Sequence, residues 1–297
     1  MSLVDLPLFD LRRPRSLDEL CGWVAESAAR GQKAVLYAGG TDWMVEQEMR
    51  PPLASETEPP PVFDVSRLAE LRGISIEGDR LTLGAATTYQ ELRRSALIAE
   101  RAPLLARMAA DVGAIQIQAR GTLGGNLATG SPAADGVAAL AAYDATIVVQ
   151  SARGERRIPF SALQTGYKRS TRAEDELFRA IEIELPAPGA AWCWRKVGAR
   201  RAQAISKVAF AAVAQIAGGR VTRFGAGMAS VGPVTALLQT TRALALSKPL
   251  SEVDDEAVDA AVDADIGPID DVRSTGVYRS HVARAVVRGF FSELRAR

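Results

Sequence analysis

Two glycine pairs, each followed by polar side chains, constrain this chain more than any other feature of its sequence. Gly39-Gly40 lies in the run AGGTDWM (residues 38–44), and Gly124-Gly125 lies in RGTLGGNLATGSPAAD (residues 120–135). A diphosphate needs many short hydrogen bonds, and consecutive backbone N–H groups can supply them where no Cβ holds the chain away. The two pairs therefore predict two backbone cradles for phosphate groups.

The residues around the glycine pairs narrow the kind of ligand. Thr41, Thr122 and Asn126 add side-chain donors beside the glycines. Neither segment has the GxGxxG or GxxxxGK[ST] spacing of the common nucleotide-binding loops, and neither contains a lysine. Cradles without a point cation suit a cofactor that stays bound. The alternative interpretation is that both segments are tight turns with glycine at positive φ.

Composition excludes several classes of protein. The chain has 297 residues and a net charge of +1, so its length suits one or two domains and its charge does not favour nucleic acid or an anionic membrane. Cys21 and Cys193 are the two cysteines, too few for an iron–sulfur set, and two isolated thiols suit a reducing cytoplasm. The one histidine, His281, argues against a multi-histidine metal site and a catalytic triad, and we interpret it as structural or on the surface.

The sequence also indicates whether a signal peptide or a membrane-spanning segment is present. The first residues, MSLVDLPLFDLRRPRS, do not have the pattern of a signal peptide. The longest apolar stretches, such as 208–217, are too short to cross a bilayer. We therefore expect a cytoplasmic protein without membrane insertion.

The first two thirds of the chain read as a mixture of helices and strands. Capping-box patterns begin at Ser16 and Thr88 and predict a helix after each, the first running to about Arg30. A Pro-rich stretch, 50–61, predicts a loop. Further helices are expected at 103–112 and from Asp135, and strands are expected at 33–37, 62–65, 73–77, 80–84, 145–150 and 178–185.

The last third has a different character. Pro186 to Gly189 predicts a boundary, after which three strands are expected to form an antiparallel sheet. Three helices should follow them. Strands followed by helices, without βαβ alternation, indicate an α+β fold. The expected strands are 192–197, 204–216 and 221–231, and the expected helices are 233–246, 252–264 and 273–297.

Both glycine segments resemble the phosphate-binding loops of a known family, the FAD-binding (medium) subunits of the xanthine dehydrogenase and carbon monoxide dehydrogenase family of molybdenum hydroxylases. AGGTDWM is similar to the first loop of that family, and RGTLGGNLATGSPAAD to the second. The similarity continues in the same order over nearly the whole chain. It includes VFDVSRLAELRGI (62–74), LGAATTYQEL (83–92), TGYKRS (165–170) and RKVGARRAQAISKVAFAA (195–212).

The resemblance implies a fold in two parts. A two-lobed FAD-binding domain of the vanillyl-alcohol-oxidase (PCMH-like) type would occupy residues 1–186, with lobes 1–55 and 56–186. A smaller α+β domain, an antiparallel sheet with helices, would occupy residues 190–297.

The resemblance also implies a set of cofactor-binding residues, with no catalytic residue and no metal ligand. Lys196 would stabilise the negative charge of the reduced flavin; its alternative is a surface cation. Asp135 would form a hydrogen bond with FAD; the alternative role for it is a helix N-cap. Trp43 stands where the family has an aliphatic residue, and the alternative role for it is a core aromatic. The implied FAD contacts are Ala38, Gly39, Gly40, Thr41, Asp42, Trp43, Thr122, Gly124, Gly125, Asn126, Asp135, Phe178 and Lys196.

The implied function is electron transfer. FAD would take electrons from a two-cluster iron–sulfur subunit, while a molybdopterin subunit oxidises the substrate, and would pass them to NAD or another acceptor. One alternative is a self-contained FAD-dependent oxidase or reductase of the same two-loop fold, although the covalent versions need a His or Cys that this chain scarcely offers. A second alternative is a non-enzymatic relative that has lost FAD.

Overall fold

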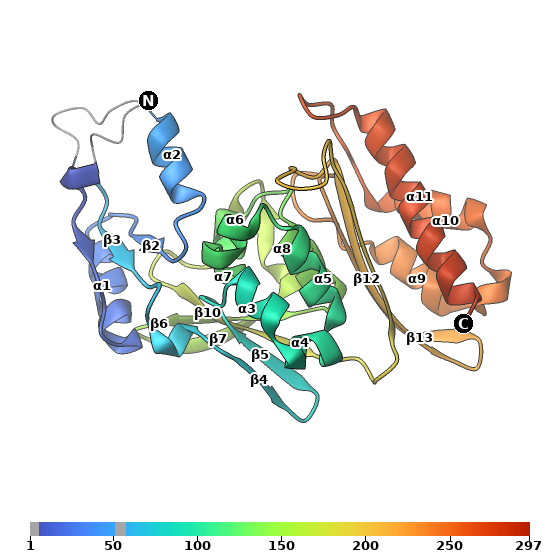
Figure 1. The fold of residues 1–297 in the computed structure, drawn as a ribbon, viewed down its shortest axis with the longest axis horizontal. Coiled ribbons are helices and arrows are strands. Elements are labelled where there is room, and N and C mark those ends of the chain that lie inside the picture. The colour runs from blue at the N-terminus through green and yellow to red at the C-terminus, as the bar shows by residue number, and fades with distance from the viewer. Residues whose placement is uncertain (1–5, 51–57) are drawn as a thin grey trace.

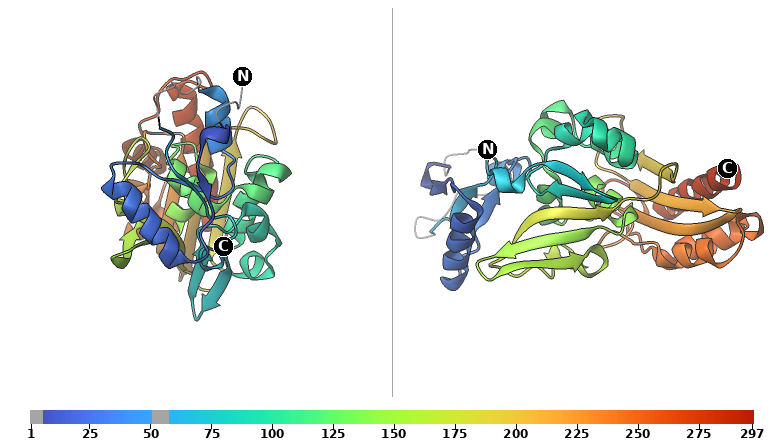
Figure 2. Two further views of the ribbon diagram at one scale, coloured as in Figure 1. Left: turned by 90° about the vertical axis from the view of Figure 1, so that its left-hand side faces the viewer. Right: turned by 90° about the horizontal axis from the view of Figure 1, so that it is seen from below.

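The computed structural model describes residues 6–50 and 58–297, so residues 51–57 of the expected Pro-rich loop lie outside the described residues. The elements form three layers along the long axis of the molecule (Figure 1). A short sheet with α1 stands at the N-terminal end, a larger sheet with helices lies in the middle, and a third sheet with helices follows. Figure 2 shows the N-terminal sheet and the C-terminal helices at opposite ends.

The N-terminal layer is a parallel sheet in the order β1-β3-β2. Helix α1 packs against it, and Leu20 and Val24 share a hydrophobic cluster with Phe63 of β3. Ser16 caps α1 by accepting a hydrogen bond from the Glu19 N–H, as the sequence predicts, although the Glu19 carboxylate accepts from the Arg15 N–H and does not complete the capping box. The elements are β1 (Leu11–Arg12), α1 (Leu17–Ala29), β2 (Val35–Tyr37), α2 (Trp43–Met49) and β3 (Val62–Asp64).

The middle layer is an antiparallel sheet in the order β4-β5-β10-β6-β7. Helices cover one of its faces, and a small β8–β9 hairpin lies beside it. The strands are β4 (Ile74–Glu77), β5 (Arg80–Gly84), β6 (Thr146–Ser151), β7 (Gly154–Pro159), β8 (Gln164–Gly166), β9 (Arg169–Ser170) and β10 (Leu177–Glu184). The helices are α3 (Tyr89–Arg94), α4 (Ala96–Arg101), α5 (Pro103–Asp111), α6 (Ile115–Arg120), α7 (Leu123–Thr129) and α8 (Asp135–Ala142).

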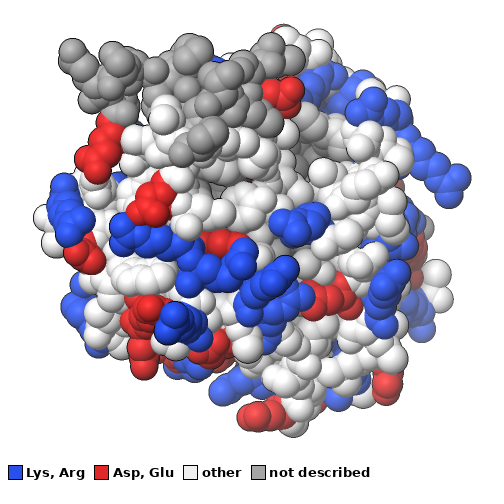
Figure 3. Space-filling view, turned by 60° about the vertical axis from the view of Figure 1, so that its left-hand side comes forward, with Lys and Arg blue, Asp and Glu red and all other residues white. Residues whose placement is uncertain are grey.

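The other face of the middle sheet is charged. Arg157 pairs with Glu182 at 2.8 Å across it, and also with Glu155 at 2.9 Å. Figure 3 shows basic and acidic side chains interleaved over the face that it presents, without a large area of one sign. This agrees with the mixed charge pattern of the sequence.

The third layer is an antiparallel sheet of β11 (Ala191–Val197), β12 (Val208–Ala217) and β13 (Arg220–Ala229). Its strands alternate between two cores. Ala209, Ala211 and Val213 of β12 share a cluster with α8, while Val208 and Phe210 share a cluster with the C-terminal helices. Those helices are α9 (Gln239–Ser247), α10 (Asp255–Asp265) and α11 (Gly276–Arg295).

The expected α+β class with a two-part architecture is confirmed, but several elements differ from the expectation. The strand expected at 204–216 begins only at Val208, and α2, α4, α6 and β7 were not expected. The glycine-dense segment is not a loop throughout, because α7 runs through it with Thr122 as its N-cap. Helix α9 begins at Gln239 and not at residue 233, because the preceding residues form a bridge between Met228 and Ala236. The division of the chain near residues 186–190 stays a prediction.

The fold also bears on the membrane-spanning segments, the histidine and the cysteines discussed from the sequence. Within residues 6–50 and 58–297, no helix combines the length and the apolar character needed to cross a membrane. His281 is exposed on α11, as expected for a surface residue, and both cysteines are buried and free.

The contact between α8 and β13 predicts a stability effect. A Cβ at Gly225 of β13 would overlap the carbonyl oxygen of Ala142, which is backbone and cannot move aside. Gly225→Ala should therefore lower the free energy of unfolding by about 1–3 kcal/mol, measured by urea denaturation. Gly289→Ala is the matched control, because a Cβ there meets nothing within 4 Å and lies inside α11; it should be neutral or stabilising by up to about 1 kcal/mol. Equal stability of the two variants would contradict the tight contact.

Candidate functional site

The two glycine segments meet in space although 75 residues (45–119) separate them. A Cβ at Gly39 would overlap the backbone carbonyl of Arg120, so glycine is required for this approach. The Thr129 hydroxyl donates a hydrogen bond of 2.7 Å to the Asp42 carboxylate. The two predicted cradles therefore belong to one site, joined by a close backbone contact and a side-chain bond.

The first segment connects β2 to α2 and leaves its backbone donors free. Within the described part of the chain, the N–H groups of Gly39, Gly40 and Thr41 have no acceptor. Gly40 has a φ of +71°, in the region that favours glycine. Consecutive unpaired N–H groups on a partly exposed loop are what a diphosphate requires. This observation shows that the residues present fit a cofactor such as FAD.

Aromatic packing fixes the end of this loop. Trp43 begins α2 and contacts Phe9 and Tyr37 edge-on, with ring centroids 5.3 and 5.7 Å away. The side chain is half-buried, so Trp43 packs against two neighbouring rings but does not lie in the core that the alternative interpretation expected. Ala38 packs against the hydrophobic cluster of the N-terminal layer.

The second segment does not offer its backbone in the expected way. The Gly124 N–H donates to the Ala85 carbonyl at 2.9 Å, and the Gly125 N–H donates to the Thr122 hydroxyl at 3.0 Å. A Cβ at Gly124 would lie 2.5 Å from the same Ala85 oxygen. Glycine here permits close packing of α7 on the residues after β5. The expectation of a second run of free N–H groups is therefore wrong, although contacts of these residues with FAD stay a prediction.

Three buried polar atoms beside α7 have no hydrogen-bond partner among the described residues. They are the Tyr89 hydroxyl, Oδ1 of Asn126 and Oδ1 of Asp135. Gly136 lies between them, since a Cβ there would lie 2.7 Å from the Asn126 oxygen and 2.9 Å from the Tyr89 oxygen. Buried polar atoms normally have partners, so this cluster also fits a polar ligand.

Tyr89 was not anticipated from the sequence. Burial raises the pKa of its phenol well above 10, with Asp135 and Asp42 adding to the shift, so the hydroxyl stays protonated and can donate. Its one sequence signal is its position directly after the capping residue Thr88. Thr129, which holds Asp42, was also missed, because a threonine near the end of a glycine-rich run carries no signal of its own.

A buried ion pair joins the second segment to the third sheet. Asp135 and Lys196 contact each other, and their side chains are only 9% and 8% exposed. The Lys196 ammonium also donates to the Asp111 carbonyl at 2.9 Å. Burial raises the pKa of Asp135 to about 6, although Lys196 lowers it.

Both alternatives weighed for this pair are therefore wrong. Lys196 is not a surface cation, because its side chain lies between Asp135 and Asp111. Asp135 is not a helix N-cap, because Ala134 occupies that position and Asp135 is the first residue of α8.

Two further segments border the site. Phe178 lies on β10 in the same hydrophobic cluster as Leu123 of α7, with the Arg172 guanidinium 5.7 Å from its ring centroid. The β8–β9 hairpin reaches both halves. Lys168 lies 3.8 Å from Glu46 of α2, and a Cβ at Gly130 would lie 3.2 Å from the Lys168 Cα.

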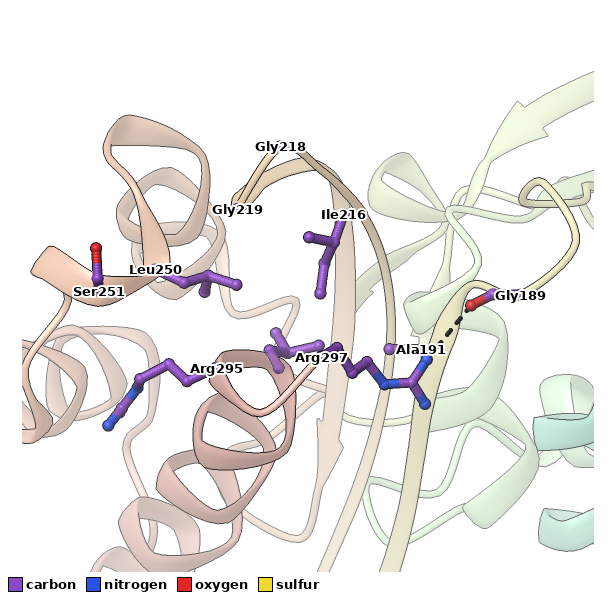
Figure 4. Close-up of a pocket in the computed structure, with 10 residues that line it drawn as sticks. Gly189, Ala191, Ile216, Gly218, Gly219, Leu250, Ser251, Arg295 and Arg297 are labelled. Carbon is purple, nitrogen blue, oxygen red and sulfur yellow. Dashed lines mark hydrogen bonds between the residues drawn. The ribbon is translucent and has the colours of Figure 1, made fainter.

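A cavity of about 780 Å³ lies elsewhere, beside the β12–β13 turn at Gly218 and Gly219 (Figure 4). Its two arginines are engaged, Arg297 with the Gly189 carbonyl at 3.3 Å and Arg295 with Asp255 at 2.6 Å. None of the predicted site residues lines this cavity. The glycine segments therefore remain the candidate site.

Comparison with known sequences finds two protein families. Residues 7–188 match the family described as the FAD binding domain in molybdopterin dehydrogenase, and residues 194–294 match the CO dehydrogenase flavoprotein C-terminal domain. The chain is 30% identical over 285 residues to the carbon monoxide dehydrogenase medium chain of Hydrogenophaga pseudoflava, covering 95% of each chain. It is 32% identical over 203 residues to the nicotinate dehydrogenase FAD-subunit of Eubacterium barkeri, covering 67% of this chain and 66% of the relative.

Solved structures show the same relationship. Carbon monoxide dehydrogenase from Hydrogenophaga pseudoflava, in a form that lacks the Mo-pyranopterin moiety of its cofactor, superposes with a TM-score of 0.86 at 28% identity and covers 95% of both chains. The reconstituted CO dehydrogenase from Oligotropha carboxidovorans has a TM-score of 0.88 at 24% identity, over 97% of this chain and 98% of the other, and shows the shared fold.

The buried pair predicts a pH-dependent stability effect. Because the pKa of Asp135 is higher in the folded state than in the unfolded state, protonation of this carboxyl group adds to the free energy of unfolding. This added stability is fully present below the unfolded pKa of about 3.9. It is lost as the pH rises through about 6. Lys196→Met removes the cation that lowers this pKa, so Asp135 should take up a proton at a still higher pH. We expect the variant to lose about 3–5 kcal/mol at pH 7.5 and clearly less at pH 5, measured by urea denaturation.

The control for this effect is the double variant Asp135→Asn/Lys196→Met, which has no titrating group at the position. Its own free energy of unfolding should carry no contribution from a carboxyl group at this position. Its loss relative to the parent should therefore be somewhat larger at pH 5, where the parent gains stability from protonated Asp135, than at pH 7.5, which is the opposite trend to Lys196→Met. A loss for Lys196→Met that is equal at both pH values would show that Asp135 is not the titrating partner.

Proposed function

We propose a function from one premise: this chain belongs to the FAD-binding family of the molybdopterin dehydrogenases. It is an oxidoreductase subunit with FAD as its cofactor, the FAD-binding subunit of a complex of the molybdenum hydroxylase type. Beyond that, we infer that the chain relays electrons. It receives them from the iron–sulfur centres of a partner subunit, while a molybdopterin subunit oxidises the substrate, and it delivers them to NAD or another external acceptor.

The observation that carries the proposal is the unpaired backbone of the first glycine segment. Three consecutive N–H groups, those of Gly39, Gly40 and Thr41, lie on a loop that the second segment holds in place. In this proposal they bind the diphosphate of FAD. Asp42 contributes indirectly, since its carboxylate accepts from Thr129 and fixes the loop against α7.

The second segment supplies side chains to the same cofactor in this proposal. Asn126 and Asp135, with the Tyr89 hydroxyl, offer the buried polar atoms that have no partner within the described residues. The Lys196 side chain contacts Asp135 beside them. Thr122, Gly124 and Gly125 position α7, and Ala38, Trp43 and Phe178 shape the apolar surroundings.

Bound FAD supplies the redox chemistry, and the other reactive groups of the chain support a relay over a self-contained oxidase. Burial raises the pKa of the Cys193 thiol to about 11, and burial also raises the pKa of Cys21, so neither thiol is an activated nucleophile. His281 is exposed on α11 and belongs to neither glycine segment. The residues of the site bind and orient the cofactor and exclude water from the Asp135–Lys196 pair.

The role of the first loop can be tested by FAD binding. In Gly40→Ala the new Cβ would overlap the Tyr37 ring, at a φ of +71° that disfavours alanine, so the N–H groups should be displaced. We expect the purified variant to retain less than a tenth of the FAD of the parent chain, measured by absorbance and release on heating. Gly78→Ala is the control, because it has a similar φ of +61° but open space, and should keep its FAD. Full FAD content in Gly40→Ala would contradict the assignment of this loop.

Electron relay is tested by leaving the chain out. The molybdopterin and iron–sulfur subunits of the complex should oxidise substrate only with an artificial electron acceptor when this chain is absent. Addition of the FAD-loaded chain should restore reduction of the physiological acceptor, followed as substrate turnover. Undiminished turnover with the physiological acceptor in its absence would refute the proposed function.

A further inference from the structure

Two loops at one end of the third sheet expose apolar side chains next to each other. The first joins β11 to β12 (residues 198–207), and the second joins α10 to α11 and includes the start of α11 (residues 266–278). The Lys207 ammonium lies 5.1 Å from the ring centroid of Tyr278, so the loops are in contact. We call residues 199–207 and 269–278 the loop surface. Its exposed apolar side chains are Ile205 (55%), Ile269 (71%), Val272 (99%), Val277 (82%) and Tyr278 (42%).

The second loop is held rigidly although its apolar side chains face solvent. Asp271 and Ser274 form a β-bridge, and the Asp271 carboxylate accepts from the N–H groups of Arg273 and Ser274 at 2.8 and 3.2 Å. The guanidinium of Arg279 donates to the same carboxylate at 2.6 Å, and its side chain is only 5% exposed. A turn that is fixed in this way presents Val272 without the entropy cost of ordering it upon binding.

The first loop is anchored as well. The N–H of Gln203 donates to the Gly113 carbonyl at 3.0 Å, which ties the loop to the connection between α5 and α6. The guanidinium of Arg200 donates to the Gln203 carbonyl. The exposed side chain of Ile205 therefore lies on a loop whose backbone is held by hydrogen bonds.

Hydrogen bonds connect this surface to the second glycine segment. Arg279 donates to the Ser230 carbonyl at 2.7 Å, and the Ser230 N–H donates to the Pro132 carbonyl at 2.8 Å. The Ser206 hydroxyl donates to the Ala133 carbonyl at 3.2 Å. Pro132 and Ala133 precede Asp135, so the loop surface is continuous with the proposed FAD site.

Basic side chains outnumber acidic ones around the apolar side chains, with Arg200, Arg201, Lys207 and Arg273 against Asp270 and Asp271. Arg200, Arg201 and Lys207 belong to the first loop, and none of them pairs with a carboxylate among the described residues. Asp271 in the second loop is shared by Arg273 and Arg279. An apolar centre with an unpaired basic rim is complementary to an apolar face with an acidic rim.

We propose that the loop surface is the docking site for the iron–sulfur partner subunit, through a face of that partner with an apolar centre and an acidic rim. The inference rests on the proposed function, because an electron donor must approach the FAD closely. The loop surface is bonded directly to the glycine segment that the proposal places against FAD, whereas the cavity beside Gly218 lies at the other end of the third sheet.

The test compares two exposed positions on helices. Val277 is the second residue of α11, after the N-cap Thr275, and Leu97 is the second residue of α4, after the N-cap Ser95. Aspartate is acceptable at both, since a carboxylate in the first turn of a helix is favourable. The double variant Val272→Asp/Val277→Asp repels an acidic partner, and Leu97→Asp, 37% exposed in the parent, is the matched control away from the loop surface.

Affinity for the isolated iron–sulfur subunit is measured by titration calorimetry with the FAD-loaded full chain. The double variant should bind at least ten times more weakly, and Leu97→Asp should bind as the parent does. FAD content and melting temperature should be unchanged in both, because neither change touches the FAD site or buries a charge.

Other outcomes separate the two proposals. If the parent chain binds the iron–sulfur subunit and the double variant binds it equally well, the docking site is wrong and the proposed function stands. If the complex assembled with the double variant lacks only the molybdopterin subunit, the loop surface binds that subunit and not the iron–sulfur subunit, and the proposal is wrong. If the parent chain with FAD binds no iron–sulfur subunit, the proposed function fails and the docking site fails with it.

Discussion

The rest of the structure depends on the complete burial of helix α8. All eight of its residues are buried, and it lies between the middle sheet and the third sheet. Its alanines allow β13 to approach closely at Gly225 and Gly227, where a Cβ would overlap the carbonyl oxygens of Ala142 and Ala138. Close packing of this kind fixes the third sheet against α8, because neither side can yield without moving backbone. The position of β11, and with it Lys196, follows from that packing.

The first turn of α8 lies in the candidate site, so the packing of α8 also positions residues of the site. Asp135 and Gly136 begin the helix, and they bring a buried carboxylate, the Tyr89 hydroxyl and the Asn126 side chain together. The two glycine segments consequently do different things. The first keeps its N–H groups free on a partly exposed loop, whereas the second uses its own N–H groups to pack α7 and offers side chains. In the proposed function, the backbone donors of the first segment bind the charged diphosphate of FAD. The buried polar side chains of the second segment bind other polar atoms of the same cofactor.

Local signals in the sequence predicted most of the fold. The caps at Ser16 and Thr88 act within three residues, so the helices that they begin could be predicted closely. The strands of the third sheet follow from their composition and spacing. What could not be predicted depends on residues far apart in the sequence. Gly39 needs its missing Cβ because of Arg120, and Gly124 because of Ala85, and neither neighbour is visible in the local pattern. Helix α7 was missed for a related reason, since glycine is a poor helix former and only tertiary packing stabilises this helix.

The same long-range contacts favour the proposed electron relay over a reaction on a substrate of the chain's own. An acid–base or nucleophilic mechanism needs titratable groups poised near neutral pH at a pocket, yet both thiols are buried with raised pKa values. Asp135, whose pKa burial raises to about 6, is bound to Lys196 inside the packed interface and is not free to exchange protons with a substrate. Electron transfer needs the opposite of a mobile, solvated pocket, because it proceeds best when the cofactor and its donor are held in fixed positions. The bonds from Arg279 through Ser230 to Pro132 meet that requirement, since they join the exposed turn at Asp271 to the glycine segment that the proposal places beside FAD.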